Sequence, residues 1–288
     1  MKNHKLSQPD YGTKVEGMDI MVPMRDGIRL AIDVYRPDAQ ERFPALLAFA
    51  AHNKFLQSPE AVEACNNQPP WAPLWVGATE AGDTRLLNSR GYVHVIGNPR
   101  GFGNSDPGDR WVEGKTDAYD LIEWIAQQPW CDGNIGMIGI SDFGRGQMIA
   151  AMTRPPHLKA IFPYDPGNFS FRDLFPGGVM HAFMLGLIRF SAENKREVKL
   201  TPAQEKLWQE AFNNPDNRMY PVIFNLLQRK GKLDLRTFRS LIHPFEQENQ
   251  DQIEEEMKKI NIPMYVGSGW YAYTYKQHLY ANFRYWEK

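Results

Sequence analysis

Residues 129–146 read PWCDGNIGMIGISDFGRG, and this stretch decides how the rest of the chain is interpreted. The turn residues Asp132-Gly133-Asn134 precede Ile135–Ile140, an apolar run of strand-forming residues. A helical pattern begins at Gln147. Between the strand and the helix stand the residues Gly139-Ile140-Ser141-Asp142-Phe143-Gly144. This order predicts a strand, a sharp turn and a helix, with a serine on the turn.

A serine on such a turn has a defined chemical role. Its Oγ is exposed above the sheet, where it can attack a carbonyl carbon. The N-terminus of the helix and the backbone N–H of the next residue can then stabilise the oxyanion that forms. The sequence therefore predicts Ser141 as a nucleophile and the N–H of Asp142 as an oxyanion donor.

Composition excludes several classes of protein. The 288 residues are enough for one large domain, or for a domain with an inserted subdomain. With 33 basic and 34 acidic residues the net charge is −1, which gives no electrostatic reason to expect a nucleic-acid partner. The two cysteines lack metal-ligand spacing and favour a cytoplasmic location. Residues 1–12 are polar, so we expect neither a signal peptide nor a membrane span.

Alternating strands and helices dominate the first half of the chain. Asp26-Gly27 between two alternating runs predicts a hairpin. Residues 44–50 are continuously apolar, as in a strand covered on both faces. Further strands are expected at 92–97 and 158–164, and a helix at 115–128. The order predicts an α/β fold with a mostly parallel sheet and helices on both faces.

The domain organisation follows from a change in composition at Asn168. Residues 1–167 are expected to form the first part of the core. Residues 168–259 carry helical patterns without strands, including one at Pro202–Asn213, and are expected to be an inserted helical lid or cap. Residues 260–288 contain the last strand, at 262–267, and a last helix. The chain ends before the strand into which that helix should lead, as expected of a truncated core.

Four stretches of this sequence carry a family resemblance. They are Val22–Gly27 with Asp33–Pro37, Arg100–Ser105, Gln128–Gly133 continuing to Gln147, and Ile262–Tyr271. In these stretches the chain resembles the cocaine-esterase-like and X-Pro dipeptidyl-peptidase family of α/β-hydrolases. The resemblance implies an α/β-hydrolase fold with a helical lid, which in the family is followed by a jelly-roll β domain. It also implies hydrolysis of an ester or amide through an acyl-enzyme, without a cofactor or a metal ion.

Two positions of the family's oxyanion site differ in this chain. Ser141 matches the nucleophile, but Asp142 stands where the family usually has a tyrosine. Its negative charge would oppose a developing oxyanion unless the carboxylate points away or is protonated. His52 occupies the position of the family's second donor, a tyrosine hydroxyl. An imidazole N–H can donate a hydrogen bond as a phenol does, and His52 could instead act as a base.

The other two members of the family's triad are also altered. Ala272 stands at the position of the acid, and losing that acid costs a serine hydrolase about 10⁴ in turnover. The family's histidine comes one strand later, beyond the last residue of this chain. His278 is a candidate substitute base. Asp165, at the expected C-terminal end of a strand, is a candidate acid or a simple turn cap. His94, inside a predicted strand, is expected to be a packed core residue.

Three explanations account for these departures. In the first, the chain is a fragment of a longer hydrolase. In the second, it is a catalytically silent homologue that serves as a binding or interaction module. Such a module could pair its open sheet edge near Val266 with a partner chain or a second copy of itself. In the third explanation, Ser141 or Asp142 attacks and His52 is the base. The resemblance favours a serine hydrolase that acts on a small-molecule ester or amide, with no nucleic-acid or membrane partner.

Overall fold

The computed structural model describes residues 8–51, 53–64, 80–108, 114–166, 200, 202–219, 224–225, 227–228 and 255–268. The chain divides into two compact units, residues 1–167 with 255–288 and residues 168–254. The second unit contains α7 (Pro202–Asn213) and α8 (Pro215–Met219). Helix α7 spans residues that the sequence predicts as helical. The function of this unit as a lid stays a prediction.

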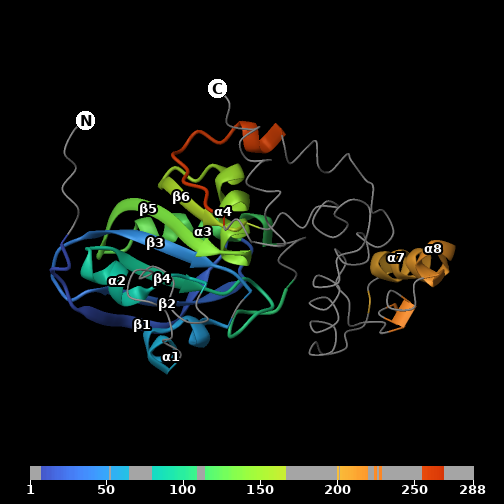
Figure 1. Ribbon diagram of the computed structural model, residues 1–288, viewed down its shortest axis with the longest axis horizontal. Helices are drawn as coiled ribbons and strands as arrows, with labels where there is room; N and C mark the ends of the chain where they lie inside the picture. Colours follow the sequence, from blue (N-terminus) through green and yellow to red (C-terminus); the bar gives the residue numbers. More distant parts are fainter. Residues whose placement is uncertain are drawn as a thin grey trace. The chain divides into compact units, whose positions relative to one another are not determined.

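The first unit is built on a six-stranded sheet with the strand order β1-β2-β4-β3-β5-β6 (Figure 1). The strands are β1 (Thr13–Pro23), β2 (Arg29–Pro37), β3 (Phe43–Phe49), β4 (Val93–Gly97), β5 (Cys131–Ile140) and β6 (Leu158–Tyr164). Strands β1 and β2 form the predicted hairpin, and β2 is antiparallel to β4. The remaining pairs are parallel. The α/β fold expected from the sequence is confirmed.

A further strand-like segment lies beside β6. Met264 and Gly267 form parallel bridges with Ile161 and Tyr164 of β6. The N–H of Tyr265 donates to the carbonyl of Ile161 at 3.1 Å. The strand expected at 262–267 therefore extends the parallel part of the sheet, and it brings residues 267 and 268 to the end of β6.

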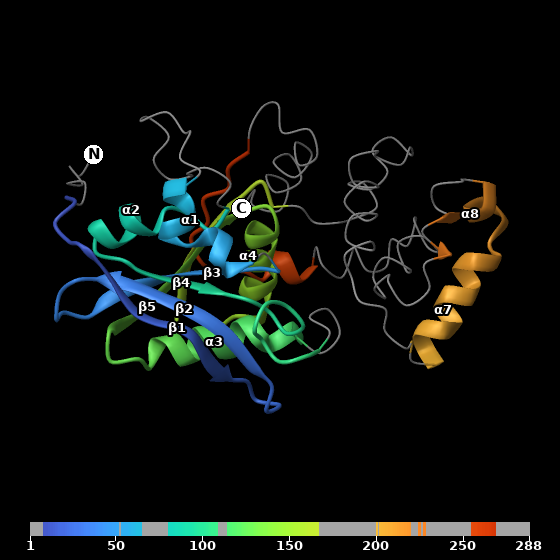
Figure 2. The same ribbon diagram turned by 90° about the horizontal axis from the view of Figure 1, so that it is seen from below.

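Helices cover both faces of the sheet. The short helices α1 (Pro59–Ala64) and α2 (Thr84–Ser89) lie on one face, and α3 (Asp117–Ala126) lies on the other (Figure 2). The 3-10 turns η1 (Lys54–Gln57) and η2 (Gly114–Thr116) precede α1 and α3 in the chain. Helix α4 (Asp142–Thr153) contributes Met148 and Ala151 to the same buried cluster as α3.

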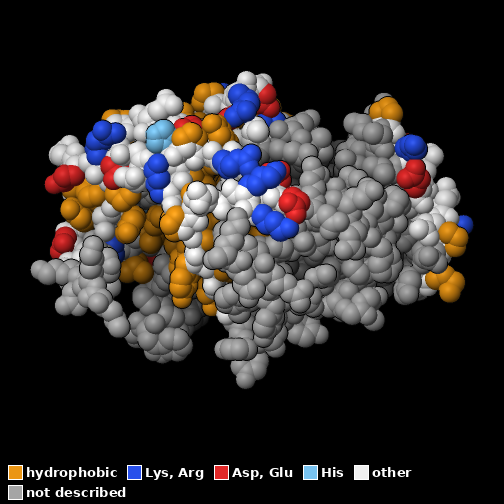
Figure 3. All heavy atoms as spheres, turned by 90° about the horizontal axis from the view of Figure 1, so that it is seen from above, with side chains coloured by type: hydrophobic (Ala, Val, Ile, Leu, Met, Phe, Trp, Pro, Cys, Tyr) orange, Lys and Arg blue, Asp and Glu red, His pale blue; other side chains and the backbone are white. Residues whose placement is uncertain are grey.

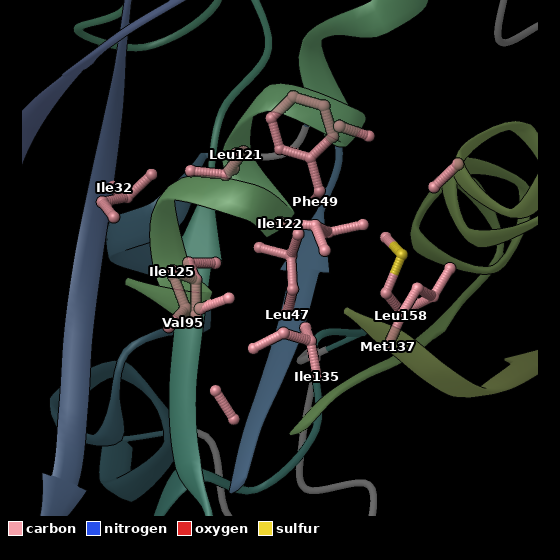
Figure 4. Close-up of a cluster of buried hydrophobic side chains, with 14 of the residues drawn as sticks. Ile32, Leu47, Phe49, Val95, Leu121, Ile122, Ile125, Ile135, Met137 and Leu158 are labelled. Atoms are coloured by element: carbon pink, nitrogen blue, oxygen red, sulfur yellow. The ribbon is translucent and has the colours of Figure 1, made fainter. Parts of the chain in front are cut away.

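The main core lies between α3 and the sheet. Leu121, Ile122 and Ile125 recur at helical spacing and are completely buried. Figure 4 shows these three side chains beside Leu47 of β3 and Val95 of β4. Burying an aliphatic side chain of this size stabilises the fold by about 1.5–3 kcal/mol relative to leaving it exposed.

Two predicted boundaries around the central stretch are wrong. Asp132-Gly133-Asn134 is not a turn before the strand but part of β5, where the pairing with β3 shifts register and Gly133 takes a φ of 89°. Glycine accepts this left-handed conformation, so the irregularity stays inside the strand. Helix α4 begins at Asp142 rather than Gln147. The helical pattern in the sequence begins after the true start of the helix, because Gly144 and Gly146 have poor helix propensity. Tertiary packing nevertheless requires glycine at both positions.

The stretch that begins at Arg100 has a structural role. The side chain of Arg100 is 2% exposed. Its Nε donates to Asp117 at 2.9 Å, and its Nη1 donates to Asp26 at 2.8 Å. These bonds join the loop after β4 to the first turn of α3 and to the β1–β2 hairpin. Gly101 is also constrained, since a Cβ there would lie 2.5 Å from the carbonyl oxygen of Gly108.

Charged side chains of both signs share the surface. On the face shown in Figure 3, basic and acidic side chains lie beside one another. Lys258 and Lys259 each pair at 2.6 Å with the glutamate three residues earlier. Within the part of the chain that the structure describes, no helix is long and apolar enough to cross a membrane.

Candidate active site

Ser141 forms the whole of the turn between β5 and α4. Its φ of 58° and ψ of −114° lie in a region that residues with a side chain rarely adopt. The Ser141 N–H donates to the carbonyl of Tyr164 at 3.0 Å, and its own carbonyl accepts the N–H of Arg145 at 2.9 Å. The surrounding backbone therefore holds the strained serine, as a nucleophile elbow requires.

Two glycines of α4 let the helix approach the strands closely. A Cβ on Gly144 would lie 2.8 Å from the carbonyl oxygen of Tyr164, at the end of β6. A Cβ on Gly146 would lie 2.7 Å from the carbonyl oxygen of Phe49, at the end of β3. Both distances are too short for real atoms. The start of α4 is thus packed against the ends of β6 and β3, the two strands that flank β5.

The carboxylate of Asp142 points to the end of β3. Its Oδ2 accepts the backbone N–H of Ala51 at 3.0 Å, and its Oδ1 accepts a hydrogen bond from Nη2 of Arg145. The two side chains are only 11% and 5% exposed. The charge of Asp142 is therefore paired with a guanidinium and bound by a backbone N–H of the loop after β3. Asp142 is also the first residue of α4, so its backbone N–H belongs to the positive end of the helix.

Residues on both sides of His52 are held by side chains, although His52 itself lies outside the described residues. Ala51 is bound by Asp142 as above, and the Oδ1 of Asn53 accepts the N–H of Phe55 at 2.9 Å, which begins η1. Lys54 follows with a buried side chain. The loop after β3 is therefore anchored directly before and directly after position 52.

Lys54 anchors this loop through a buried ionic group. Its Nζ lies 2.8 Å from Oδ1 of Asp19 and 2.9 Å from Oδ1 of Asp33. Asp33 is 1% exposed, and its Oδ1 also accepts the N–H of Asp19 at 2.9 Å. The hydrogen bond from Lys54 holds the pKa of Asp19 below its usual range. The group ties the loop to β1 and β2.

Asp165 lies at the C-terminal end of β6, next to the elbow in space. It directly follows Tyr164, the residue whose carbonyl accepts the N–H of Ser141. Its own N–H donates to the carbonyl of Gly267 at 2.8 Å, and its Oδ1 accepts a hydrogen bond from the hydroxyl of Ser268. Its φ is 43°, in the left-handed region. Burial, together with the nearby charge of Asp165, raises the pKa of the Tyr164 phenol.

His94 is the packed core residue that the sequence predicts. It is completely buried, with Nδ1 at 2.9 Å from the hydroxyl of Thr84 and Nε2 at 3.1 Å from the carbonyl of Ala81. Burial lowers its pKa to about 4. His94 is therefore a neutral structural residue.

The structure brings together some of the predicted site residues. Ser141, Asp142 and Asp165 meet at one end of the parallel strands, where α/β proteins place their sites. Ala272 and His278 lie outside the described residues, as His52 does. The geometry of a base and of the family's acid position therefore stays a sequence-based prediction.

Three residues of this region were not predicted from the sequence. Arg145 follows Asp142 by three positions on a helix, a spacing that brings two side chains together and that could have revealed the pair. Lys54 and Ser268 bind carboxylates that are distant in sequence. No local pattern signals such contacts.

The strand order and the strained serine between a parallel strand and a helix define the class of protein. This is an α/β-hydrolase fold with a nucleophile elbow. The family follows from the sequence over most of the chain. The chain belongs to the X-Pro dipeptidyl-peptidase (S15) family, whose model matches residues 26–288.

Curated relatives support this family. The chain is similar to a cocaine esterase of Rhodococcus sp. (strain MB1 Bresler), with 35% identity over 169 residues. It is also similar to a putative serine esterase of Mycobacterium bovis, with 30% identity over 170 residues. Each match covers 56% of this chain and 26% of the relative. The chain thus matches about a quarter of the length of these relatives.

Solved structures share the fold. A CocE/NonD family hydrolase from Staphylococcus aureus aligns with a TM-score of 0.55 at 21% identity, over 92% of this chain and 46% of that one. An α-amino acid ester hydrolase aligns with a TM-score of 0.59 at 16% identity, over 93% and 44%. These similarities support the α/β-hydrolase fold.

Proposed function

We propose that this chain is a serine hydrolase that cleaves an ester or amide bond through an acyl-enzyme. The observation that carries the proposal is the conformation of Ser141 on the turn between β5 and α4. Strain of this kind persists where it presents a nucleophile. Membership of a family named for a peptidase, and similarity to a protein named cocaine esterase, support the same class of reaction.

The oxyanion would form beside the first turn of α4. The N–H of Asp142 is one proposed donor, and its carboxylate is directed to Ala51 and Arg145. Since the charge is paired, it opposes an oxyanion less than an isolated carboxylate would. His52 is the second proposed donor or the base, because it adjoins Ala51 in the chain. His278 is the other proposed base.

A catalytically silent homologue is the competing function. Ala272, at the family's acid position, is the observation that favours it, because a serine hydrolase loses about 10⁴ in turnover without its acid. A silent homologue would serve as a binding module, alone or paired with a second chain at the sheet edge. The match covers only 26% of the length of the cocaine esterase. This coverage supports a third proposal, that the chain is part of a longer hydrolase.

Covalent labelling of Ser141 tests the proposal. The purified chain is incubated with a fluorophosphonate probe, and the labelled peptide is identified by mass spectrometry. Hydrolysis of p-nitrophenyl acetate and p-nitrophenyl butyrate is measured in parallel. We expect labelling at Ser141 and turnover, both abolished in Ser141→Ala. A wild-type chain that is neither labelled nor active would favour the silent homologue.

For the substrate we propose a chemical class, and the cellular location is a prediction from the sequence. We propose a small-molecule ester or amide as substrate. The cytoplasmic location that the cysteine usage favours stays a prediction, as do assembly with a partner and the absence of a cofactor.

A further inference from the structure

A hollow lies at the opposite end of α4 from Ser141, where the chain turns from this helix into β6. Its lining comes from the end of α4, the start of β6 and residues 259–263. Its volume is about 420 Å³, and small-molecule sites usually have roughly 300–1,000 Å³. Helix α4 has 12 residues, so about 18 Å separate its two ends. The hollow is therefore separate from the site at Ser141.

The walls of the hollow are apolar and held in place by the core. Ala151, Leu158 and Ile260 line the hollow and also belong to the main buried cluster, where they are 2% to 6% exposed. Pro155 and Pro156 lie in the turn between α4 and β6, and the ring of proline fixes the backbone φ. Walls that are already rigid lose little freedom when a ligand binds.

Three cations line the hollow, namely Arg154, Lys159 and Lys259. The side chains of Arg154 and Lys259 are 56% and 54% exposed, so both can reach a ligand from solution. The Nζ of Lys159 donates to the carbonyl of Pro156 at 2.8 Å. Because this acceptor is neutral, the bond orients the ammonium without neutralising it. The three side chains form a basic rim around the apolar walls.

One carboxylate already binds at this basic rim. Oε2 of Glu256 lies 3.5 Å from Nη1 of Arg154, and its Oε1 lies 2.6 Å from Nζ of Lys259. Figures 1 and 2 show residues 255–258 beside α4. The hydrogen bond from Lys259 holds the pKa of Glu256 below its usual range. The adjacent pair of Lys258 and Glu255 adds no net charge. Among the described residues, three cations of the rim thus face one carboxylate.

We propose that this hollow binds a small amphipathic carboxylate, an organic acid with an apolar body. The basic rim binds the carboxylate group, as Arg154 and Lys259 bind Glu256. The body of the acid lies against the apolar walls, where removal of its surface from water is favourable. A cationic ligand with the same body would be repelled by the rim. The inference does not depend on the hydrolase function, because Ser141 does not line the hollow.

Binding of 4-phenylbutyrate to the purified chain tests the proposal. Isothermal titration calorimetry compares this acid with 4-phenylbutan-1-ol and 4-phenylbutylamine, which keep the body and change the charge, and with acetate, which keeps the carboxylate alone. We expect the Kd of 4-phenylbutyrate to be about tenfold or more below the other three, and to rise with salt concentration. An absence of binding, or equal binding of the alcohol or of acetate, would overturn the proposal.

Two sets of substitutions locate the bound acid and act in opposite directions. Arg154→Met combined with Lys159→Met removes two cations of the rim and should raise the Kd by about tenfold or more. Glu256→Gln removes the carboxylate that competes for the rim and should lower the Kd by about threefold or more. Lys14→Met, at an exposed position of β1 on the other edge of the sheet, is the matched control and should leave the Kd unchanged.

The two directions distinguish this site from binding elsewhere. An acid bound at another place, including the substrate site, would have the same Kd in all these variants, and that result would overturn the proposal. Urea unfolding checks that each variant is folded. Should the double variant fail to fold, Glu256→Gln alone decides, because tighter binding supports the proposal and unchanged binding contradicts it.

Discussion

The carboxylate of Asp142 accepts the backbone N–H of Ala51 at 3.0 Å, and this bond links the elbow to the end of β3. Sequence alone placed a negative charge beside the expected oxyanion. The structure directs that charge to the loop after β3 and pairs it with Arg145. Asp142 thereby joins the turn that presents Ser141 to the loop that continues into His52. In the proposed mechanism, the backbone N–H of Asp142 binds the oxyanion while its carboxylate binds Ala51 and Arg145.

Removing Arg145 should destabilise the fold strongly. In Arg145→Met, the carboxylate of Asp142 stays buried without its cation, which typically costs about 3–5 kcal/mol. The double variant Asp142→Asn with Arg145→Met should be less destabilised than the sum of the single variants, since neither charge is then left alone. Urea unfolding of the four proteins gives the coupling free energy. Additive effects would mean that the pair is not formed.

Lys54 should be equally important for the loop after β3. Lys54→Met leaves the carboxylate of Asp33, which is 1% exposed, without its cation, and we expect a loss of about 3–5 kcal/mol. Asp33→Asn in the same chain should recover part of this loss. Asp19→Asn is the matched control, because the Asp19 side chain is 46% exposed and its pair should contribute about 1 kcal/mol or less. Chemical denaturation of these three variants and of the wild-type chain measures the losses.

Gly146 should not tolerate the substitution that normally stabilises a helix. Alanine is favoured over glycine by about 1 kcal/mol inside a helix, but a Cβ here would lie 2.7 Å from the carbonyl oxygen of Phe49. We therefore expect Gly146→Ala to destabilise by about 1–3 kcal/mol. It should also slow the fluorophosphonate labelling of Ser141, since α4 must shift away from β3.

Gly27→Ala provides the control for this prediction. Gly27 has a φ of 86°, and a Cβ there would meet no atom within 4 Å. The substitution adds backbone strain in the hairpin, about 1–2 kcal/mol, without moving the elbow. Its labelling rate should equal that of the wild type. Equal labelling of Gly146→Ala would contradict the close packing of α4.

His94 should make stability depend on pH. Burial lowers its pKa from 6.5 to about 4, so the unfolded chain binds a proton that the folded chain excludes. The stabilisation is complete above pH 6.5 and is lost as the pH falls toward 4, by about 3 kcal/mol in total. Urea unfolding at pH 7.5, 6, 5 and 4.5 measures this slope. His94→Gln, which retains a donor and an acceptor, should give a flatter profile across the same range.

Local patterns were sufficient to predict the elbow and the sheet. The apolar run 135–140 followed by Ser141, and Asp26-Gly27 between alternating runs, are signals within single elements. They predict strands, a hairpin and a nucleophile turn because hydrophobic periodicity and turn chemistry act over a few residues. The family resemblance, also readable from the sequence, is confirmed by the match over residues 26–288.

The boundaries around the elbow depend on packing instead. Gly133 has the sequence signature of a turn residue, yet Cys131 and Ile135 on either side of it pair with β3, so it lies within β5. Gly144 and Gly146 read as weak helix formers, yet α4 runs through them because only glycine fits against β3 and β6. Local propensity is a weak prior, and close approach of two backbones overrides it.

By itself, the sequence determined which residue stands on the elbow, Ser141, and the order of strands and helices that surround it. Only the tertiary structure decided which groups bind the carboxylates of Asp142 and Asp165. The carboxylate of Asp142 binds Ala51 and Arg145, while that of Asp165 accepts a hydrogen bond from Ser268. Local sequence specifies which elements form, but only the folded sheet brings together side chains from strand ends that are distant along the chain.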